Sequence, residues 1–165
     1  MVFTGNRQID LQAFDDPTPE GGEVVLEIKA SGMSGSDLHI YRSPGGGSER
    51  AKKLRLGGPG KPSIGGHEPS GVVAARGPGV AKTACSRRRL FHGASLCRLR
   101  DMPRLFAGWS QLCKVDPMQV FAVTGNGAHA PYIKVPVFTL LPLSEELSFE
   151  AGAAISCGTG TPTVR

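Results

Sequence analysis

Residues 65–71 have the sequence Gly-Gly-His-Glu-Pro-Ser-Gly and constrain the fold more than any other stretch of the chain. The glycines permit tight bends and close backbone approach, and Pro69 fixes one φ angle. Four apolar residues, 72–75, follow at once and predict a buried strand. His67 and Glu68 are therefore expected at a strand entrance. An imidazole beside a carboxylate suits zinc, but most such pairs in glycine-rich turns are surface hydrogen bonds, so further ligands are needed.

The composition favours a turn-rich β protein, because 23 glycines and 13 prolines accompany only 6% aromatic residues in 165 positions. This length corresponds to one ordinary domain, or to one domain plus a piece of another. No apolar run is long enough for a bilayer span and no secretory signal pattern begins the chain, so we expect a cytoplasmic protein with no membrane partner. The four cysteines form no compact disulfide framework and are considered first as metal ligands or reactive thiols.

The net charge of +5 comes from one segment. Residues 81–106 hold seven Lys and Arg against Asp101 alone, which gives +6 and leaves −1 for the rest of the chain. Such a run could neutralise phosphates. It brings few aromatic side chains for stacking on bases, and basic runs are more often simply solvated, so no nucleic-acid partner is expected.

The first half of the chain contains the strongest strand pattern. Residues 23–30 are rich in β-branched residues and predict a strand, and residues 9–14 alternate as a half-buried strand does. The segment 31–39 begins as a glycine turn, and either Ser36 or Asp37 is expected to cap a short helix.

The last third predicts further strands at residues 119–123 and 130–136. A short helix should follow, capped by Ser144 or Ser148, with acidic residues in its first turn. The glycine-rich residues 43–63 lack the strand and helix of a dinucleotide-binding fingerprint and are expected to form a solvated loop.

Three motifs in order carry a family resemblance. The strand at 23–30, the turn Gly-Met-Ser-Gly-Ser-Asp-Leu-His at 32–39 and the Gly-His-Glu at 66–68 resemble the N-terminal half of zinc-dependent medium-chain alcohol dehydrogenases. That half is their GroES-like catalytic domain. The resemblance covers residues 23–80 and resumes over 108–161.

The resemblance implies a mainly β fold, namely a partly open GroES-like β-barrel with short helices. This domain would span residues 1–155, and residues 156–165 would be the start of a cofactor-binding domain.

The same resemblance implies a proton relay and a zinc site. Ser36 and His39 occupy the positions of the family's relay, although their ordinary interpretation is a helix cap and a surface imidazole. Ser34 stands where the family has its first cysteine ligand, and a hydroxyl ligates zinc more weakly than a thiolate. Cys157, which by its apolar neighbours alone would be a packing residue, occupies the last ligand position. The metal ligands implied are His67, Glu68, Cys157 and Ser34, of which Ser34 would weaken zinc binding.

Residues 81–106 depart from the family. The family has a Val-Gly-Asp-Arg-Val strand there, followed by a loop with four closely spaced cysteines around a structural zinc. In this chain Cys85, Cys97 and Cys113 are too widely spaced for such a loop, and no strand alternation is present. We interpret residues 81–106 as a displaced reading frame, caused by a real frameshift or by a sequence error. We expect this segment to be poorly ordered or to lack the family's zinc lobe, and we expect low overall stability.

No strand followed by Gly-x-Gly-x-x-Gly occurs in the sequence, and the pyrophosphate of NAD(P) needs that element. The function expected is a catalytic-domain fragment of a zinc-dependent, NAD(P)-linked alcohol or polyol dehydrogenase. By resemblance its substrate is a small alcohol, but the chain alone should neither bind NAD(P) nor turn over. Family members form homo-oligomers, and this chain is expected not to. The alternative is a non-enzymatic metal-binding β module or an inert pseudogene product.

Overall fold

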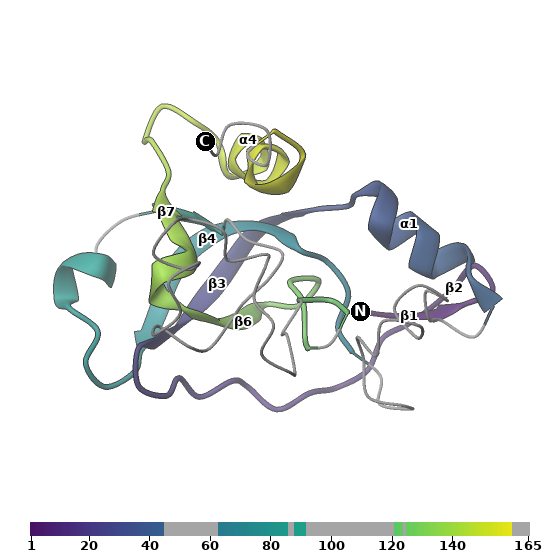
Figure 1. Ribbon diagram of the computed structural model, residues 1–165, viewed down its shortest axis with the longest axis horizontal. Helices are drawn as coiled ribbons and strands as arrows, with labels where there is room; N and C mark the ends of the chain where they lie inside the picture. The colour runs from purple at the N-terminus through teal and green to yellow at the C-terminus, as the bar shows by residue number, and fades with distance from the viewer. Residues whose placement is uncertain (45–62, 86–87, 92–120, 124, 160–165) are drawn as a thin grey trace, which may run out of the picture.

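The computed structural model of the protein describes residues 1–44, 63–85, 88–91, 121–123 and 125–159. In these ranges the fold is mainly β with two short α-helices, as the sequence predicted (Figure 1). The strands are β1 (Val2–Gly5), β2 (Gln8–Asp10), β3 (Glu23–Gly32), β4 (Glu68–Arg76), β5 (Arg88–Phe91), β6 (Tyr132–Pro136) and β7 (Leu140–Pro142). The helices are α1 (Gly35–Arg42) and α4 (Phe149–Ala154), with 3₁₀ turns η2 (Lys82–Cys85) and η4 (Val137–Thr139) and a π-helical turn η5 (Ile155–Thr159).

Five strands form one antiparallel sheet in the order β6-β3-β4-β5-β7. Among the described residues no pairing joins β6 to β7, so the sheet stays open. Its core lies along the paired strands β3 and β6, because Val24, Leu26 and Val135 are completely buried there and Ile133 is nearly so. Burying such a side chain contributes about 1.5–3 kcal/mol, so this strand pair stabilises the sheet.

The central pair β3–β4 contains two bulges. Val25 pairs with Ala75 and Leu26 with Val73, which leaves one residue of β4 unpaired. Further along, Ile28 pairs with Gly71 and Ala30 with Ser70, which leaves one residue of β3 unpaired. Each bulge adds a residue to one strand only and increases the local twist. Beyond them the strands run in register to the last pair, Gly32 with Glu68.

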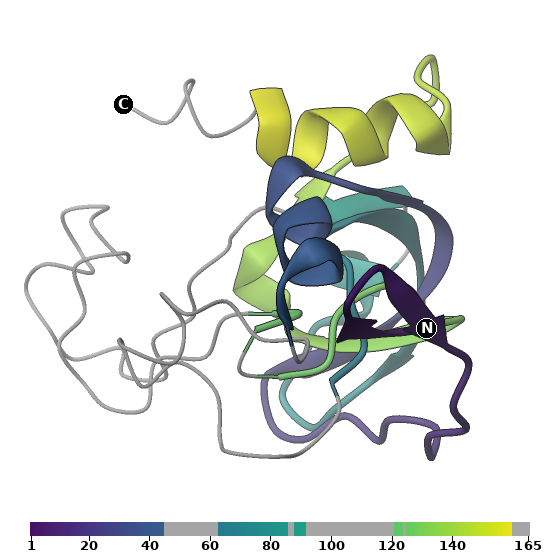
Figure 2. The same ribbon diagram turned by 90° about the vertical axis from the view of Figure 1, so that its right-hand side faces the viewer.

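Two capped helices flank this end of the pair. Ser34 is the N-cap of α1, and Asp37 completes a capping box because its side chain accepts a hydrogen bond from the Ser34 amide. Helix α4 is capped by Ser148 and lies over β3 and β4 (Figures 1 and 2). The hydroxyl of Ser70 donates to the Phe149 carbonyl and ties α4 to β4.

Most of the predicted elements are confirmed. Strands occupy residues 23–32, 68–76 and 132–136, and the second helix begins after Ser148. The first helix also forms, but its cap is Ser34 and not Ser36 or Asp37, because Ser34 begins the Ser-x-x-Asp capping box.

Two further sequence predictions were wrong. The half-buried strand at residues 9–14 is absent: β2 ends at Asp10, its residues are exposed, and Leu11 is 84% exposed, because β2 pairs only with β1 and meets no core. In the segment 119–123, where a strand was predicted, the described residues 121–123 form an isolated bridge and a turn. Residues 88–91, in the segment without strand alternation, form β5, because backbone pairing with β4 and β7 holds this strand.

The predictions for residues 45–62 and 92–120 lie outside the described residues. Among the helices that are described, none has the length and apolar character that a bilayer crossing requires.

Candidate metal centre

Three predicted ligands meet at the end of the β3–β4 pair. One ligand atom each from His67, Glu68 and Cys157 lie within 4.8 Å of one another. His67 and Glu68 enter β4, and Cys157 arrives on η5, which continues from α4. A nitrogen, an oxygen and a sulfur donor so placed fit zinc, which binds these three atom types and keeps a fourth position open in catalytic sites. The structure thus unites residues separated by most of the chain.

The Glu68 carboxylate lies against β3, opposite Gly32. A Cβ atom at Gly32 would come within 2.5 Å of Glu68 Oε2, which is far inside normal contact. A larger residue at this position would displace the carboxylate from its present place, where Glu68 is 7% exposed. The glycine of the turn motif therefore shapes the ligand cluster.

Both ring nitrogens of His67 have a polar neighbour. Nδ1 lies 3.4 Å from Asp37 Oδ2, and Nε2 lies 3.2 Å from Ser34 Oγ. A histidine that binds a metal through one nitrogen commonly uses the other to contact a carboxylate, which fixes the orientation of its ring. The His67 ring has this arrangement, with Asp37 as the carboxylate.

Asp37 is completely buried and connects several groups of the site. It accepts hydrogen bonds from the Ser34 amide at 2.9 Å and the Gly66 amide at 3.3 Å. Burial would raise the pKa of Asp37, but the bonds from His67 and Ser34 and the charges of His67 and His129 together lower it to about 2. Asp37 is therefore a permanent anion in the neutral pH range.

The pKa of His67 is raised above 6.5. The hydrogen bond with Asp37 is the largest cause; burial opposes it, and the negative charges of Asp37 and Glu68 add to it. The site thus favours positive charge on or beside this imidazole, as a cation-binding site should.

A second histidine, His129, interacts electrostatically with Asp37. Its backbone amide donates to the Gly65 carbonyl and the Ala128 amide donates to the Gly66 carbonyl, both at 2.8 Å. These bonds hold residues 128–129 against the segment that leads into His67. Its Nδ1 lies 3.1 Å from Ser31 Oγ, whereas its Nε2 is buried without a hydrogen-bond partner among the described residues. Burial lowers the pKa of His129, with Asp37 acting against the shift.

Asp37 and His129 were both missed by sequence reasoning as site residues. The Ser-x-x-Asp spacing of a capping box could have indicated Asp37, because that pattern turns its carboxylate back toward Ser34. No local signal identifies His129, because it reaches the site only through the pairing of two distant loops.

The predicted relay residues lie on α1. Ser36 and His39 are both exposed, and their three-residue spacing places them on neighbouring parts of the helix surface. The Ser36 amide donates to Ser34 Oγ, and the His39 carbonyl accepts from Ser43. Within the described chain no hydrogen bond joins the Ser36 and His39 side chains, so their role as a relay remains a prediction.

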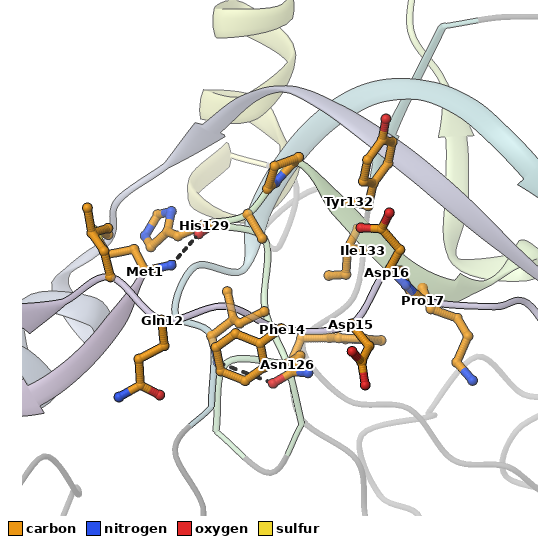
Figure 3. Close-up of a pocket in the computed structure, with 16 residues that line it drawn as sticks. Met1, Gln12, Phe14, Asp15, Asp16, Pro17, Asn126, His129, Tyr132 and Ile133 are labelled. Carbon is orange, nitrogen blue, oxygen red and sulfur yellow. Dashed lines mark hydrogen bonds between the residues drawn. The ribbon is translucent and has the colours of Figure 1, made fainter.

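A separate hollow of about 450 Å³ lies beside the N-terminal segment (Figure 3). Phe14, Tyr132 and Ile133 contribute apolar surface, and Asp15, Asp16 and other polar groups surround them. His129 stands at one end, where its carbonyl accepts from the Met1 amino group at 2.8 Å. The residues of the metal cluster do not line this hollow.

Comparisons with known proteins identify the family of the chain. The family described as the alcohol dehydrogenase GroES-like domain matches residues 20–145. An uncharacterized zinc-type alcohol dehydrogenase-like protein, YphC, of Escherichia coli (strain K12) is 33% identical over 162 residues, which is 95% of this chain and 43% of the relative. Sorbitol dehydrogenase 1 of Saccharomyces cerevisiae is 34% identical over 134 residues, or 80% of this chain and 34% of the relative.

Solved structures share the fold. Acetophenone reductase from Geotrichum candidum, in complex with NAD, superposes with a TM-score of 0.74 at 25% identity, over 94% of this chain and 42% of its own. A cobalt- and zinc-bound thermostable alcohol dehydrogenase from Pyrobaculum aerophilum gives 0.74 at 22% identity, over 95% and 44%. The chain spans less than half the length of these proteins. Because this family match covers residues 20–145, which is more than half of the chain, the chain belongs to the alcohol dehydrogenase GroES-like domain family.

Proposed function

We propose that this chain is the catalytic-domain part of a zinc-dependent, NAD(P)-linked alcohol or polyol dehydrogenase. The observation that carries the proposal is the convergence of His67, Glu68 and Cys157 beside the buried carboxylate of Asp37. The family match and the alcohol and polyol dehydrogenases among the relatives support the same assignment.

His67, Glu68 and Cys157 are the residues that would hold zinc. When bound, zinc supplies Lewis-acid chemistry, which lowers the pKa of an alcohol hydroxyl. Asp37 holds the His67 ring in place from its buried position. Ser36 and His39, on the exposed surface of α1, are proposed to pass the alcohol proton to solvent.

Hydride transfer needs a nucleotide-binding element as well. The 165 residues contain no Gly-x-Gly-x-x-Gly sequence, so we propose that this polypeptide alone does not bind NAD(P) and does not oxidise alcohols. The substrate class is a small-molecule alcohol, with no nucleic-acid or membrane partner. We further propose that the chain is a monomer in the cytoplasm. In this proposal residues 1–155 form the GroES-like domain, and residues 156–165 are the start of the cofactor-binding domain.

The zinc assignment is tested by metal content after exhaustive dialysis. We expect about one zinc per chain in the unmodified protein and a large loss in His67→Ala and Cys157→Ala, because each variant removes one of three donors. His39→Ala is the matched control, since it removes an exposed imidazole and should leave the zinc content unchanged. Unchanged zinc in both ligand variants would make the assignment wrong.

Turnover is tested separately, with NAD or NADP and with ethanol, sorbitol or threonine as substrate. We expect no reduction of the nicotinamide by the 165-residue chain. Reproducible turnover that is lost in Cys157→Ala would overturn the proposed inactivity and establish the chain as an enzyme. A chain with neither zinc nor turnover would instead favour the alternative of an inert product.

A further inference from the structure

The two ring nitrogens of His67 are both engaged, and a metal ion needs one of them. Nδ1 faces Asp37 at 3.4 Å, and Nε2 faces the Ser34 hydroxyl at 3.2 Å. A neutral imidazole carries one ring N–H and one ring-nitrogen lone pair, so a metal ion can bind His67 only at a nitrogen whose present neighbour is displaced. Which neighbour yields decides what Ser34 does in the site.

Asp37 is the neighbour that cannot yield easily. It is completely buried and accepts from two backbone amides, those of Ser34 and Gly66. One of these bonds belongs to the capping box that begins α1. Moving the carboxylate away would break these bonds and leave a buried charge without partners, which is costly. Nδ1 therefore keeps its contact with Asp37, and Nε2 is the nitrogen left for the metal.

The Ser34 hydroxyl can give up His67 at little cost. Its oxygen also lies 3.2 Å from Asp37 Oδ2, to which it can donate, and 3.1 Å from the Ser36 amide, from which it accepts. A hydroxyl has only one proton, so the proton that holds Nε2 turns to Asp37 when the metal takes Nε2, while one lone pair keeps the bond from the Ser36 amide. After release from Nε2 the hydroxyl stays hydrogen-bonded as the cap of α1, so no buried polar group is stranded.

We propose that the Ser34 hydroxyl competes with a divalent metal ion for Nε2 of His67, and does not serve as a ligand. Ser34 thereby sets the metal affinity of the site formed by His67, Glu68 and Cys157. The inference rests on the proposed function in that it takes this cluster as the metal site. It replaces the expectation from sequence that Ser34 is a weak fourth ligand, and the two interpretations predict opposite signs for the same substitution.

The test compares the affinity for Zn²⁺ and for Co²⁺ of the unmodified 165-residue chain with that of Ser34→Ala and Ser34→Gly, by competition with a chromophoric chelator. Both variants lack the hydroxyl, but glycine largely keeps the helix cap whereas alanine does not. We expect both to bind either ion more tightly, by about three- to tenfold, the change that one hydrogen bond of ordinary net strength produces.

Each other outcome has a definite meaning. A lower affinity in both variants would identify the hydroxyl as a ligand and overturn the inference, while leaving the metal site itself in place. Equal affinity in all three proteins, or a rise in only one variant, would also overturn it, because the hydroxyl would then not be what is displaced. Absence of Zn²⁺ binding by all three proteins at millimolar metal would overturn both the inference and the metal site of the proposed function.

Discussion

Two histidines interact with one buried carboxylate, that of Asp37, and their surroundings make them chemically different. His67 contacts polar groups through both ring nitrogens. It lies close to the carboxylates of Asp37 and Glu68 and to the thiol of Cys157. His129 is packed edge-on against Phe3, with ring centroids 5.8 Å apart, and has one nitrogen without a partner among the described residues. The pKa of His67 is raised and that of His129 is lowered.

The difference shows what separates a ligand histidine from a packing histidine. Both residues are partly buried, so burial alone does not distinguish them. The hydrogen bond with Asp37 decides the direction for His67, whereas burial decides it for His129. Three sets of substitutions test this difference between the two histidines.

Replacing Asp37 should have the largest effect. In Asp37→Ala the capping box of α1 is lost, and His67 loses the anion that raises its pKa. We expect a loss of about 3–5 kcal/mol in the free energy of unfolding, the usual cost of removing one partner of a buried ion pair. Urea denaturation measures this, with Asp10→Ala as the control, because Asp10 is exposed and should matter little. A loss of less than about 1 kcal/mol would show that Asp37 does not hold the site together.

The pH dependence of stability should separate the two histidines next, because their pKa values move in opposite directions. The raised pKa of His67 contributes stability that is complete below pH 6.5 and is lost as the pH rises through its folded value. The lowered pKa of His129 contributes stability that is complete above pH 6.5 and is lost as the pH falls through its folded value. A tenfold difference in proton affinity between the folded and unfolded chains changes the free energy of unfolding by about 1.4 kcal/mol.

Thermal unfolding between about pH 5 and 9 would test this, since that range spans the unperturbed histidine pKa. His67→Gln should remove the loss on the alkaline side, and His129→Gln the loss on the acid side. Imidazole resonances followed by NMR in the metal-free protein give the two pKa values directly. Titration of both rings on the same side of pH 6.5 would contradict the contrast.

The smallest effect is expected at Ser31, the hydrogen-bond partner of His129. Ser31→Ala should cost about 1 kcal/mol, the ordinary net value of one hydrogen bond. In a His129→Phe background the same substitution should cost almost nothing, because the partner is already gone. Equal losses in both backgrounds, measured by urea denaturation, would mean that Ser31 acts through some other contact.

Local patterns in the sequence predicted much of the fold and part of the site. The β-branched run at 23–30 and the caps before both helices are local signals, and each produced the expected element within a few residues. The convergence of Cys157 with His67 was expected only through the family resemblance, because no spacing rule joins residues so far apart. Strand β5 and the position of His129 depend on pairing between distant backbones, which leaves no periodic trace in the sequence.

The two bulges of the β3–β4 pair compensate each other in the number of residues that each strand contains. From Val24 to Gly32 and from Arg76 to Glu68 the strands advance by the same number of residues, so the extra residue in one strand cancels the extra residue in the other. Adjacent residues on a strand face opposite sides of the sheet, so after the second bulge paired residues of β3 and β4 face the same side again, just before the ligands begin. A single insertion or deletion in either strand would destroy this match. Since Val24 is completely buried at the far end, the mismatch would be pushed toward Glu68, and the carboxylate would be turned away from its two companions.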